Sequence, residues 1–349
     1  MCPFAPRSSR RPATPRPPWG LAGASLLLLV LALAAAPAAR ADVAIHCLKV
    51  GQGDATLIVS SSGQKLLFDA GDNGKGTSVV VPYLTGLGIS QLTHIAVSHY
   101  HADHLGGVDE VYNAKGVSGA VYDRGWSYTT ATYNSYAALV APKRQTLTDL
   151  QVIDLGDGVT ATVVAINGSG ALSPPFTDGT NDENDFCVGL HVQAGDFDFF
   201  VAGDLSGIKD SYYENIESAI ASRIGDLEVY HVSHHGSYSA SNAYFLSVLQ
   251  PEVAIISVGS NSYGHPAQVT LDRLATAGAF VYQTEAGDGG TLPANQLSVE
   301  NNHIVIVSDG YGDYTVNGDT WTNDEPDLTD VPLTPAFALL GAWPNPFNP

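Results

Sequence analysis

The sequence predicts an α/β (α+β) fold in which two mixed β-sheets pack together and helices cover them on the outside. From residue 43 onward, short apolar runs with alternating or β-branched residues are separated by glycine, serine and aspartate, as in strands joined by turns. In the second half of the chain, similar runs alternate with helical patterns. The 349 residues, 44% of them hydrophobic, suffice for one large domain or two small ones. Two packed sheets with outer helices would bury this apolar content.

Residues 43–166 contain the predicted elements of the first half. Apolar runs bounded by glycine, serine and aspartate predict strands, and apolar residues at helical spacing that stop at glycine or proline predict helices. Asp157-Gly158, between two strand-like runs, predicts a hairpin. We therefore expect strands at residues 43–50, 56–60, 65–68 and 94–97, helices at residues 79–87, 103–112 and 131–140, and a hairpin at residues 152–166.

Residues 167–185 separate the two halves and are rich in Gly, Ser, Pro, Asp and Asn. A loop of this length in a compact domain is usually functional, so we expect it to reach towards the active site. Cys47 and Cys187 fall in strand-like runs, and we prefer two buried thiols to a disulfide between them. After the loop we expect strands at residues 186–193, 197–202, 227–232, 253–258 and 280–283, and helices at residues 208–221, 240–249 and 267–277.

Both ends of the chain differ from this domain. Residues 1–41 combine a basic start, an apolar run at residues 21–36 and the small-residue cleavage pattern Ala39-Arg40-Ala41, which predicts a secretion signal. An uncleaved membrane anchor is the alternative, although the apolar run is short for a membrane span. Residues 311–349 predict an acidic linker and then, at residues 344–349 (PNPFNP), either the truncated start of a C-terminal sorting-type tail or a plain proline-rich end.

The charge of the chain limits its partners. Removal of residues 1–41 leaves 10 of the 15 basic residues and all 35 acidic ones, a net charge of −25. Such a chain lacks a broad electrostatic footprint for nucleic acid, which we therefore expect only as a substrate. We expect no transmembrane domain after removal of the signal, because no other apolar run has the length of a span. The expected location is secreted, periplasmic or at the cell surface.

The most informative stretch is residues 98–107 (SHYHADHLGG), which follows a predicted buried strand. His99 and His101 are two residues apart, so they point the same way from a strand end or from the loop after it. Asp103 and His104 follow where a helix could begin. Imidazole and carboxylate ligands without a thiolate suit Zn²⁺, Mn²⁺ or Fe, and the stretch therefore predicts a site for a divalent metal ion.

This HxHxDH pattern is the signature of the metallo-β-lactamase superfamily, and other segments resemble that family in the same order. They are residues 65–71 (KLLFDAG), a strand ending in Asp-x-Gly, residues 202–204 (AGD) and residues 231–237 (HVSHHGS). Residues 50–55 (VGQGDA) and 261–266 (NSYGHP) are similar to the hydrolase domain of ComEC-type DNA-uptake proteins and to its stand-alone relatives. The resemblance implies a four-layer αββα sandwich, formed here by a hydrolase domain at residues 42–310.

The resemblance also implies a site for one or two divalent metal ions, with Zn²⁺ preferred and Mn²⁺ or Fe as alternatives. The implied ligands are His99, His101, Asp103, His104, Asp204 and His234. The first two would hold the first ion, Asp103 and His104 would hold the second, and Asp204 would bridge the ions. His234 would complete the shell of the second ion, with His235 either as the ligand in its place or as a group that faces the substrate.

One ligand is missing from this pattern. Between His104 and Asp204 the sequence has only His191, in a strand-like run, so the separate middle histidine of dinuclear superfamily members has no obvious match. Three alternatives remain open at this point. The first ion has an open shell, or the site holds a single tightly bound ion, or Asp185 or Asn184 at the end of the long loop substitutes.

Other residues would lie behind the ligands or beside the substrate. Those implied are Asp54, Asp69, His235, Ser237 and Tyr263. Asp69 would orient ligands from behind, and His265 would meet the substrate or protonate the leaving group. Asp103 would also accept a proton from the attacking water. The aromatic-rich residues 126–136 either line a substrate groove or pack within the domain.

Such a site implies hydrolysis by a metal-activated hydroxide. The predicted function is a secreted metal-dependent hydrolase of phosphodiesters, a phosphodiesterase or nuclease like the ComEC domain. Lactams, lactones and phosphorylcholine esters are alternative small-molecule substrates, with lactams disfavoured because the middle histidine is missing. A surface-displayed binding module on an inactive hydrolase fold is an alternative of another class, and the intact ligand set argues against it. The tail predicts a further partner, because a secretion machinery would recognise it.

Overall fold

Residues 42–168, 176 and 181–322 are described by the structure, a computed structural model. Within them, nine strands form a first sheet and eight form a second. Those of the first sheet are β1 (Val43–Cys47), β2 (Thr56–Ser60), β3 (Lys65–Phe68), β4 (His94–Ala96), β5 (Val121–Asp123), β6 (Arg144–Thr146), β15 (Ile304–Ser308), β16 (Tyr314–Val316) and β17 (Asp319–Trp321). Those of the second sheet are β7 (Val152–Asp154), β8 (Val159–Ala165), β9 (Gly189–Ala194), β10 (Phe197–Val201), β11 (Val229–His231), β12 (Val253–Ile256), β13 (Phe280–Gln283) and β14 (Leu297–Val299).

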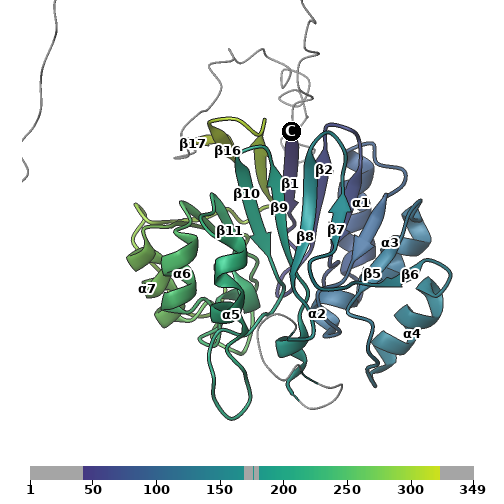
Figure 1. The fold of residues 1–349 in the computed structure, drawn as a ribbon, viewed down its shortest axis with the longest axis horizontal. Helices are drawn as coiled ribbons and strands as arrows, with labels where there is room; N and C mark the ends of the chain where they lie inside the picture. Colours follow the sequence, from purple (N-terminus) through teal and green to yellow (C-terminus); the bar gives the residue numbers. More distant parts are fainter. Residues whose placement is uncertain (1–41, 169–175, 177–180, 323–349) are drawn as a thin grey trace, which may run out of the picture. The chain divides into compact units, whose positions relative to one another are not determined.

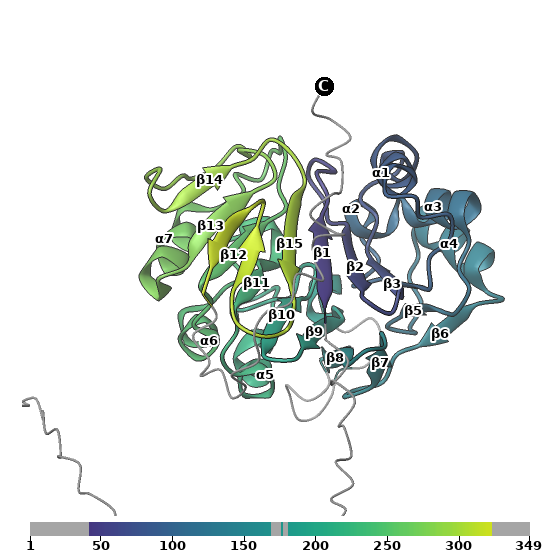
Figure 2. The same ribbon diagram turned by 90° about the horizontal axis from the view of Figure 1, so that it is seen from above.

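Helices cover the outer faces of the two sheets. The α-helices are α1 (Val81–Gly86), α2 (Ala102–Leu105), α3 (Val108–Lys115), α4 (Ala131–Val140), α5 (Ile216–Ile224), α6 (Ala243–Leu249) and α7 (Gln268–Ala277). Short turns of other helix types are η1 (Gly76–Val80), η2 (Glu183–Phe186) and η3 (Ser233–Gly236). Figure 1 and Figure 2 show α1, α3 and α4 on the side of the first sheet and α5, α6 and α7 on the side of the second. The predicted fold class, two mixed sheets flanked by helices, is confirmed.

Each sheet joins an antiparallel part to a parallel part. In the first sheet β1, β2 and β3 are antiparallel, whereas β3, β4, β5 and β6 run parallel. In the second sheet β7 to β10 are antiparallel and β10 to β14 run parallel. Ligands of such sheets bind outside the carboxyl ends of parallel strands. The loops after β3, β4, β10, β11 and β12 contain almost all of the predicted site residues.

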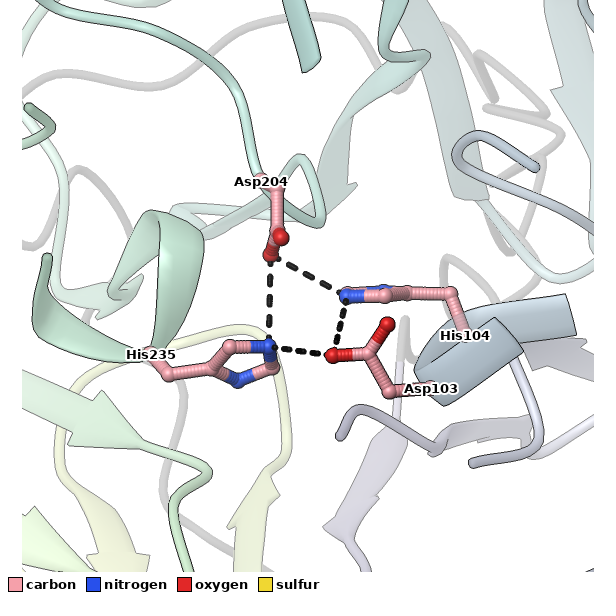
Figure 3. Close-up of side chains that lie close together, drawn as sticks. All are labelled: Asp103, His104, Asp204 and His235. Carbon is pink, nitrogen blue, oxygen red and sulfur yellow. Dashed lines mark ion pairs between the residues drawn. The ribbon is translucent and has the colours of Figure 1, made fainter. Parts of the chain in front are cut away.

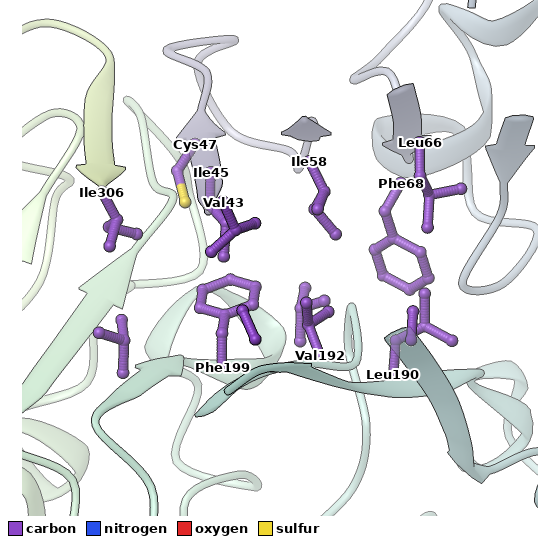
Figure 4. Close-up of a cluster of buried hydrophobic side chains, with 14 of the residues drawn as sticks. Val43, Ile45, Cys47, Ile58, Leu66, Phe68, Leu190, Val192, Phe199 and Ile306 are labelled. Carbon is purple, nitrogen blue, oxygen red and sulfur yellow. The ribbon is translucent and has the colours of Figure 1, made fainter. Parts of the chain in front are cut away.

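The two sheets and the helices outside them form four layers of secondary structure, and an apolar layer lies at each of the three interfaces between them. The central one joins the inner faces of the two sheets, where Ile45, Ile58 and Phe68 meet Val192 and Phe199 (Figure 4). A second layer packs the first sheet against α1, α3 and α4, and a third packs the second sheet against α5, α6 and α7. Burial of this apolar surface is the main favourable contribution to folding.

Most predicted elements occur within a few residues of their predicted bounds. The strands at residues 56–60, 65–68 and 280–283 and the helix at residues 131–140 have the predicted ends, and β7 and β8 form the predicted hairpin. The helix predicted at residues 79–87 is present as η1 followed by α1. Cys47 and Cys187 are both buried and free, as predicted.

The helix predicted at residues 103–112 is divided into α2 and α3, with Gly106 and Gly107 between them. There the backbone bonds to the loop after β3, because the Gly107 N–H donates to Gly71 O at 2.9 Å. A Cβ atom on Gly107 would lie 2.2 Å from Ala70 O, so a side chain at this position would clash. The two glycines therefore allow the loop that follows β3 to approach α2 closely.

The helix predicted at residues 208–221 begins later, as α5. Asp210 Oδ1 accepts a hydrogen bond from the Tyr212 N–H at 2.7 Å, which stabilises a turn in place of a first helical turn. Asn215 then caps α5 by accepting from the Ser218 N–H at 3.0 Å. Local side-chain bonds that compete with the helix explain the later start.

The prediction of an acidic linker directly after residue 310 is wrong for residues 314–321. β16 and β17 form a hairpin that extends the first sheet next to β15. Asn317 and Gly318 at its turn have φ values of 49° and 93°, as two-residue hairpin turns require. Tyr314 and Val316 are buried in the central apolar layer. The Asn-Gly pair between two apolar runs was the signal that predicts this hairpin.

The remaining predictions about the chain ends lie outside the described residues. These are the signal at residues 1–41 and the sorting-type tail at the end of the chain. Residues 169–175 and 177–180 of the loop between β8 and β9 also lie outside the described residues. Across the part of the chain that is described, we find no helix with the length and apolar character needed to cross a bilayer.

Glu228, which precedes β11, gives the structure a testable pH dependence. It is only 5% exposed, and burial together with the nearby charges of Asp198 and Glu252 raises its pKa to about 8. The stability linked to this shift is fully present below pH 4.5 and is lost as the pH rises through 8. We expect Glu228→Gln to raise the free energy of unfolding by on the order of 2 kcal/mol at pH 9 and by little at pH 5. Urea unfolding of both proteins at each pH measures this, and an equal offset at both pH values would contradict it.

Candidate metal centre

The predicted ligands lie in loops that follow strand ends of both sheets. β4 leads into His99 and His101, and α2 then carries Asp103 and His104. From the second sheet, β10 leads to Asp204, and β11 leads to η3 with its two histidines. The packing of the two sheets therefore brings together side chains that are 100 or more residues apart in the sequence.

Four side chains meet around the Oδ1 atom of Asp204 (Figure 3). This atom lies 3.1 Å from His104 Nε2 and 3.4 Å from His235 Nε2. Asp103 Oδ2 lies 3.4 Å from His235 Nε2 and 4.0 Å from His104 Nε2. We call these four residues the Oδ1 group. The structure places His235 in it, although the sequence favoured His234 beside Asp103 and His104.

A second group lies around the other oxygen of Asp204. Asp204 Oδ2 is 3.6 Å from His234 Nε2 and 3.9 Å from His99 Nε2. His99 Nε2 is in turn 3.0 Å from His101 Nδ1, and the His99, His101 and Asp204 side chains can converge on one ion. We call Asp204, His99, His101 and His234 the Oδ2 group. The two neighbouring histidines of η3 thus face different oxygens of one carboxylate.

The spacing of these atoms fits metal ligands. Two atoms that each lie about 2.1 Å from one ion in tetrahedral geometry are roughly 3.4 Å apart, and the contacts within the two groups run from 3.0 to 4.0 Å. Three of the atoms, His104 Nε2, His235 Nε2 and Asp204 Oδ1, are buried and make no hydrogen bond to any described residue. Because buried polar atoms are normally satisfied, these inward-facing atoms fit a bound cation.

The charges of the site also favour a cation. Burial disfavours the charged form of His104, yet the carboxylates of Asp204 and Asp103 raise its pKa well above the usual value. Burial opposes ionisation of Asp204, but the imidazoles, His104 above all, hold its pKa well below the usual range. Burial likewise opposes ionisation of Asp103, and His104 and His235 lower its pKa to about 2. The carboxylates thus draw positive charge, and a divalent cation would displace the imidazole protons.

Asp69 lies directly behind the ligands, where the sequence placed it. Its Oδ1 accepts from the Ser98 N–H at 2.8 Å, and its Oδ2 accepts from Ser98 Oγ at 2.6 Å and lies 2.9 Å from His104 Nδ1. Asp69 is fully buried and has a φ of 60°, an unusual backbone conformation for a residue other than glycine. A carboxylate that binds Nδ1 fixes the ring so that Nε2 faces inward.

The two histidines of η3 are oriented in the same way by different partners. His235 Nδ1 lies 2.9 Å from Ser257 O, and His234 Nδ1 lies 3.2 Å from Ser239 Oγ. The φ values of His234 and His235, 56° and 52° respectively, place both residues in the left-handed region. Such conformations are strained in residues other than glycine and cluster at functional sites. Here they direct two successive side chains to the two sides of Asp204.

Asp54 is a buried carboxylate behind the Oδ1 group. Its Oδ1 lies 3.5 Å from His235 Nδ1 and 4.0 Å from His231 Nε2, and its Oδ2 lies 3.9 Å from His104 Nδ1. Burial opposes its ionisation, but these imidazoles lower its pKa. His231 is fully buried, and its Nε2 lies 2.9 Å from Ser257 Oγ. Asp54 therefore faces the rear of both imidazoles that approach Asp204 Oδ1.

His265 and Tyr263 approach the site from the loop after β12. The His265 ring lies 5.5 Å from that of His234, and Gln52 Nε2 is 3.4 Å from His265 Nδ1. Burial and the neighbouring imidazoles lower the pKa of His265 to about 4. Tyr263 stacks on His265 and is 75% exposed. Asn261 holds this loop, because its Oδ1 accepts from the N–H groups of both residues at 3.0 Å.

Ser237 lies behind His234, in the turn after η3. Its Oγ lies 3.0 Å from Ser239 Oγ, its carbonyl accepts from Thr270 Oγ1, and its N–H donates to His234 O. The side chain is buried within the turn after η3, and its partner Ser239 Oγ in turn lies 3.2 Å from His234 Nδ1. Ser237 therefore supports the backbone that carries the histidines.

A buried ion pair beside the site was missed from the sequence. Arg124 Nε and Nη2 donate to Glu183 Oε1 and Oε2 at 2.9 and 2.6 Å, and both residues are buried. Glu183 Oε1 also accepts from the Tyr100 N–H at 2.9 Å, between the ligands His99 and His101. The position of Arg124 directly after β5, a parallel strand, was the available signal.

Comparisons with known proteins agree with this geometry. A family profile described as the metallo-beta-lactamase superfamily matches residues 48–260. Competence protein ComA of Neisseria gonorrhoeae is 28% identical over 247 residues, 70% of this chain and 31% of that protein. ComE operon protein 3 of Bacillus subtilis (strain 168) is 26% identical over 281 residues, 73% of this chain and 33% of that protein. The chain spans about a third of the length of these curated relatives.

Solved structures give likenesses of lower identity. The metallo-beta-lactamase fold protein YhfI from Bacillus subtilis is 14% identical, with a TM-score of 0.44, and the match covers 72% of this chain and 99% of that chain. The profile match covers more than half of the chain, and it includes every residue of the Oδ1 and Oδ2 groups. The chain therefore belongs to the metallo-β-lactamase superfamily of metal-dependent hydrolases.

Proposed function

We propose that the protein is a phosphodiesterase that uses two divalent cations, with nucleic acid as its substrate. The observation that carries this proposal is the position of Asp204, whose Oδ1 and Oδ2 atoms face different sets of imidazoles. In two-metal hydrolytic sites the two cations lie close together, and a carboxylate placed like Asp204 could contact both of them. Such sites suit in-line attack on phosphodiesters. When bound, the cations supply an activated water near neutral pH and stabilise negative charge on the attacked group.

In this proposal the Oδ2 group holds the first cation and the Oδ1 group holds the second. His234 thereby takes the place beside His99 and His101 for which the sequence offers no middle histidine. His235 takes the place beside Asp103 and His104. Zn²⁺ and Mn²⁺ both suit this mixture of imidazole and carboxylate ligands.

The chain's own residues would position the reactants. Asp103 is the most open of the carboxylates at the site, with its side chain 32% exposed, so it would accept the proton of the attacking water. Asp69 and Asp54 would keep the imidazoles oriented from behind. His265 and Tyr263, on a third loop, would contact the substrate.

Aromatic side chains beside the histidines of the site support a substrate that carries bases. Tyr213 lies 6.2 Å from His234, Tyr128 lies 6.2 Å from His101, and Tyr263 stacks beside His265. Such rings can stack on unpaired bases. Tyr133 and Tyr136, on α4, are instead buried in the apolar layer between α4 and the first sheet.

The similarity to competence proteins also favours nucleic acid as the substrate. The excess of acidic residues predicts weak non-specific binding, so turnover would depend on the site and not on a basic surface. We further propose that the protein acts outside the cytoplasm, in the periplasm, at the cell surface or in the medium. The signal-like pattern of residues 1–41 is the basis for this location.

A substrate panel tests the proposed reaction. We expect the purified protein to cleave bis(p-nitrophenyl) phosphate and a single-stranded oligonucleotide, and to lose both activities when a chelator removes the cations. We expect Asp103→Asn to lower both rates by about 10²-fold or more, since a positioned base contributes about that factor. Asp109→Asn, on α3 outside the site, is the matched control and should keep them.

The same panel separates the alternatives. Turnover of a chromogenic lactam, a lactone or a phosphorylcholine ester without phosphodiester cleavage would overturn the proposed substrate while leaving the metal site intact. A protein that binds no cation and cleaves none of these compounds would instead fit a binding module on an inactive fold.

A further inference from the structure

The turn η2 lies against the Oδ2 group, beside His234. Asn184 of this turn is 4% exposed, and its Nδ2 lies 3.5 Å from His234 Nε2. Its Oδ1 is buried and makes no hydrogen bond to any residue that the structure describes. A buried amide oxygen without a partner normally costs free energy, and a rotation of the amide would turn this oxygen towards His234.

The neighbouring carboxylate is already occupied. Both oxygens of Asp185 accept from the Glu214 N–H, at 3.0 and 3.2 Å, and Oδ2 also accepts from Asn181 Nδ2 at 3.3 Å. Asp185 therefore secures the loop between β10 and α5. Of the two residues at the end of the long loop, only Asn184 has a side chain that faces the ligand histidines.

The position of Asn184 is fixed by its surroundings. The Asn184 N–H donates to Asp182 Oδ1 at 3.0 Å. The adjacent Glu183 is held by the two hydrogen bonds from Arg124, and the Arg124 guanidinium lies 4.2 Å from the centre of the Tyr100 ring. Because Glu183 also binds the Tyr100 N–H, one buried ion pair ties η2 to the backbone between His99 and His101.

We propose that the amide oxygen of Asn184 is a further ligand of the first cation, beside His234. The Asn184 Nδ2 atom lies 3.5 Å from His234 Nε2. A rotation of the amide by 180° exchanges its oxygen and nitrogen, so that Oδ1 takes this position. Two tetrahedral ligands of one ion are roughly 3.4 Å apart. A metal-bound imidazole has no free lone pair for an N–H donor, so the oxygen is the atom that faces a loaded site. This inference rests on the two-cation function proposed above.

An amide oxygen changes which cation the first site prefers. Carbonyl and carboxylate oxygens suit Mn²⁺ better than a histidine does, whereas imidazole ligands suit Zn²⁺. We therefore expect Asn184→Ala to weaken Mn²⁺ binding more than Zn²⁺ binding at the first site. Asn184→His, which restores an imidazole, should shift the preference towards Zn²⁺.

Titration with Mn²⁺, followed by the electron paramagnetic resonance signal of the free ion, tests the proposal without an activity measurement. We expect the wild-type protein to bind two Mn²⁺ ions. In Asn184→Ala one of the two should bind about 10- to 100-fold more weakly, the range found when groups that support a metal site are removed. Asn184→Asp, which keeps an oxygen at the same position, should bind both. Asn134→Ala, at an exposed position of α4 outside the site, is the matched control.

The outcomes separate this inference from the function on which it rests. Two ions bound with unchanged affinity in Asn184→Ala would overturn the role of Asn184 and leave the two-cation site standing. A wild-type protein that binds neither Mn²⁺ nor Zn²⁺ would overturn both. Should Asn184→Ala fail to fold, as circular dichroism would reveal, weak binding in a folded Asn184→Asp protein would still contradict the proposal.

Discussion

Replacement of Asp204 by alanine is expected to remove both bound cations and to lower phosphodiester turnover by at least about 10³-fold. Asp204 is the one described residue that both ligand groups share, with Oδ1 at 3.1 Å from His104 Nε2 and Oδ2 at 3.6 Å from His234 Nε2. Cations contribute several kcal/mol of transition-state stabilisation in such sites, and about 4 kcal/mol corresponds to 10³-fold in rate. Elemental analysis of the dialysed variant and its rate with bis(p-nitrophenyl) phosphate measure the two effects.

Two further variants make this result specific. Asp204→Asn keeps the shape and removes the charge, and it should lose most of the bound metal as well. Asp226→Ala, exposed in the loop before β11, should keep the metal and the rate. An Asp204→Ala protein that still holds two ions per chain would contradict the role of Asp204 as the shared ligand.

The neighbouring histidines of η3 give the second large effect. We expect His234→Ala and His235→Ala each to lose one ion, and to lose different ions, because their Nε2 atoms lie 3.6 and 3.4 Å from different oxygens of Asp204. Loss of one of two cooperating cations is expected to cost about 3 kcal/mol, or roughly 10²-fold in turnover.

Each variant serves as the matched control for the other. Cobalt-substituted samples distinguish the two sites, because the absorption of Co²⁺ depends on its ligands. Two spectra that sum to that of the wild-type protein would support the assignment. The ligand set inferred from the sequence predicts a different result. In that set His235→Ala keeps both ions and His234→Ala loses the second ion, and this outcome would contradict the assignment made from the structure.

The sequence was sufficient to predict the local part of the site. His99, His101, Asp103 and His104 lie within six residues, so strand and helix geometry alone indicates that their side chains converge. The fold class was also predictable, because the apolar runs and their turn residues define most strands.

The choice between His234 and His235 could not be made from the sequence. The two are adjacent and chemically identical, and only the left-handed backbone of η3 and the partners Ser239 and Ser257 decide which ring faces which oxygen. Left-handed conformations of residues other than glycine carry no reliable local signal. The same limit applies to Asn184, whose relation to His234 exists only after the two halves of the chain have packed.

The central claim is that this chain holds two divalent cations that act together on a phosphodiester. The most direct measurement is the metal content of the purified protein, determined on the same sample as its rate with bis(p-nitrophenyl) phosphate before and after chelation. We predict two ions per chain and a rate that chelation abolishes and added Mn²⁺ or Zn²⁺ restores. A protein that contains no metal under replete conditions, or one whose phosphodiester turnover survives complete removal of its metal, would contradict the account.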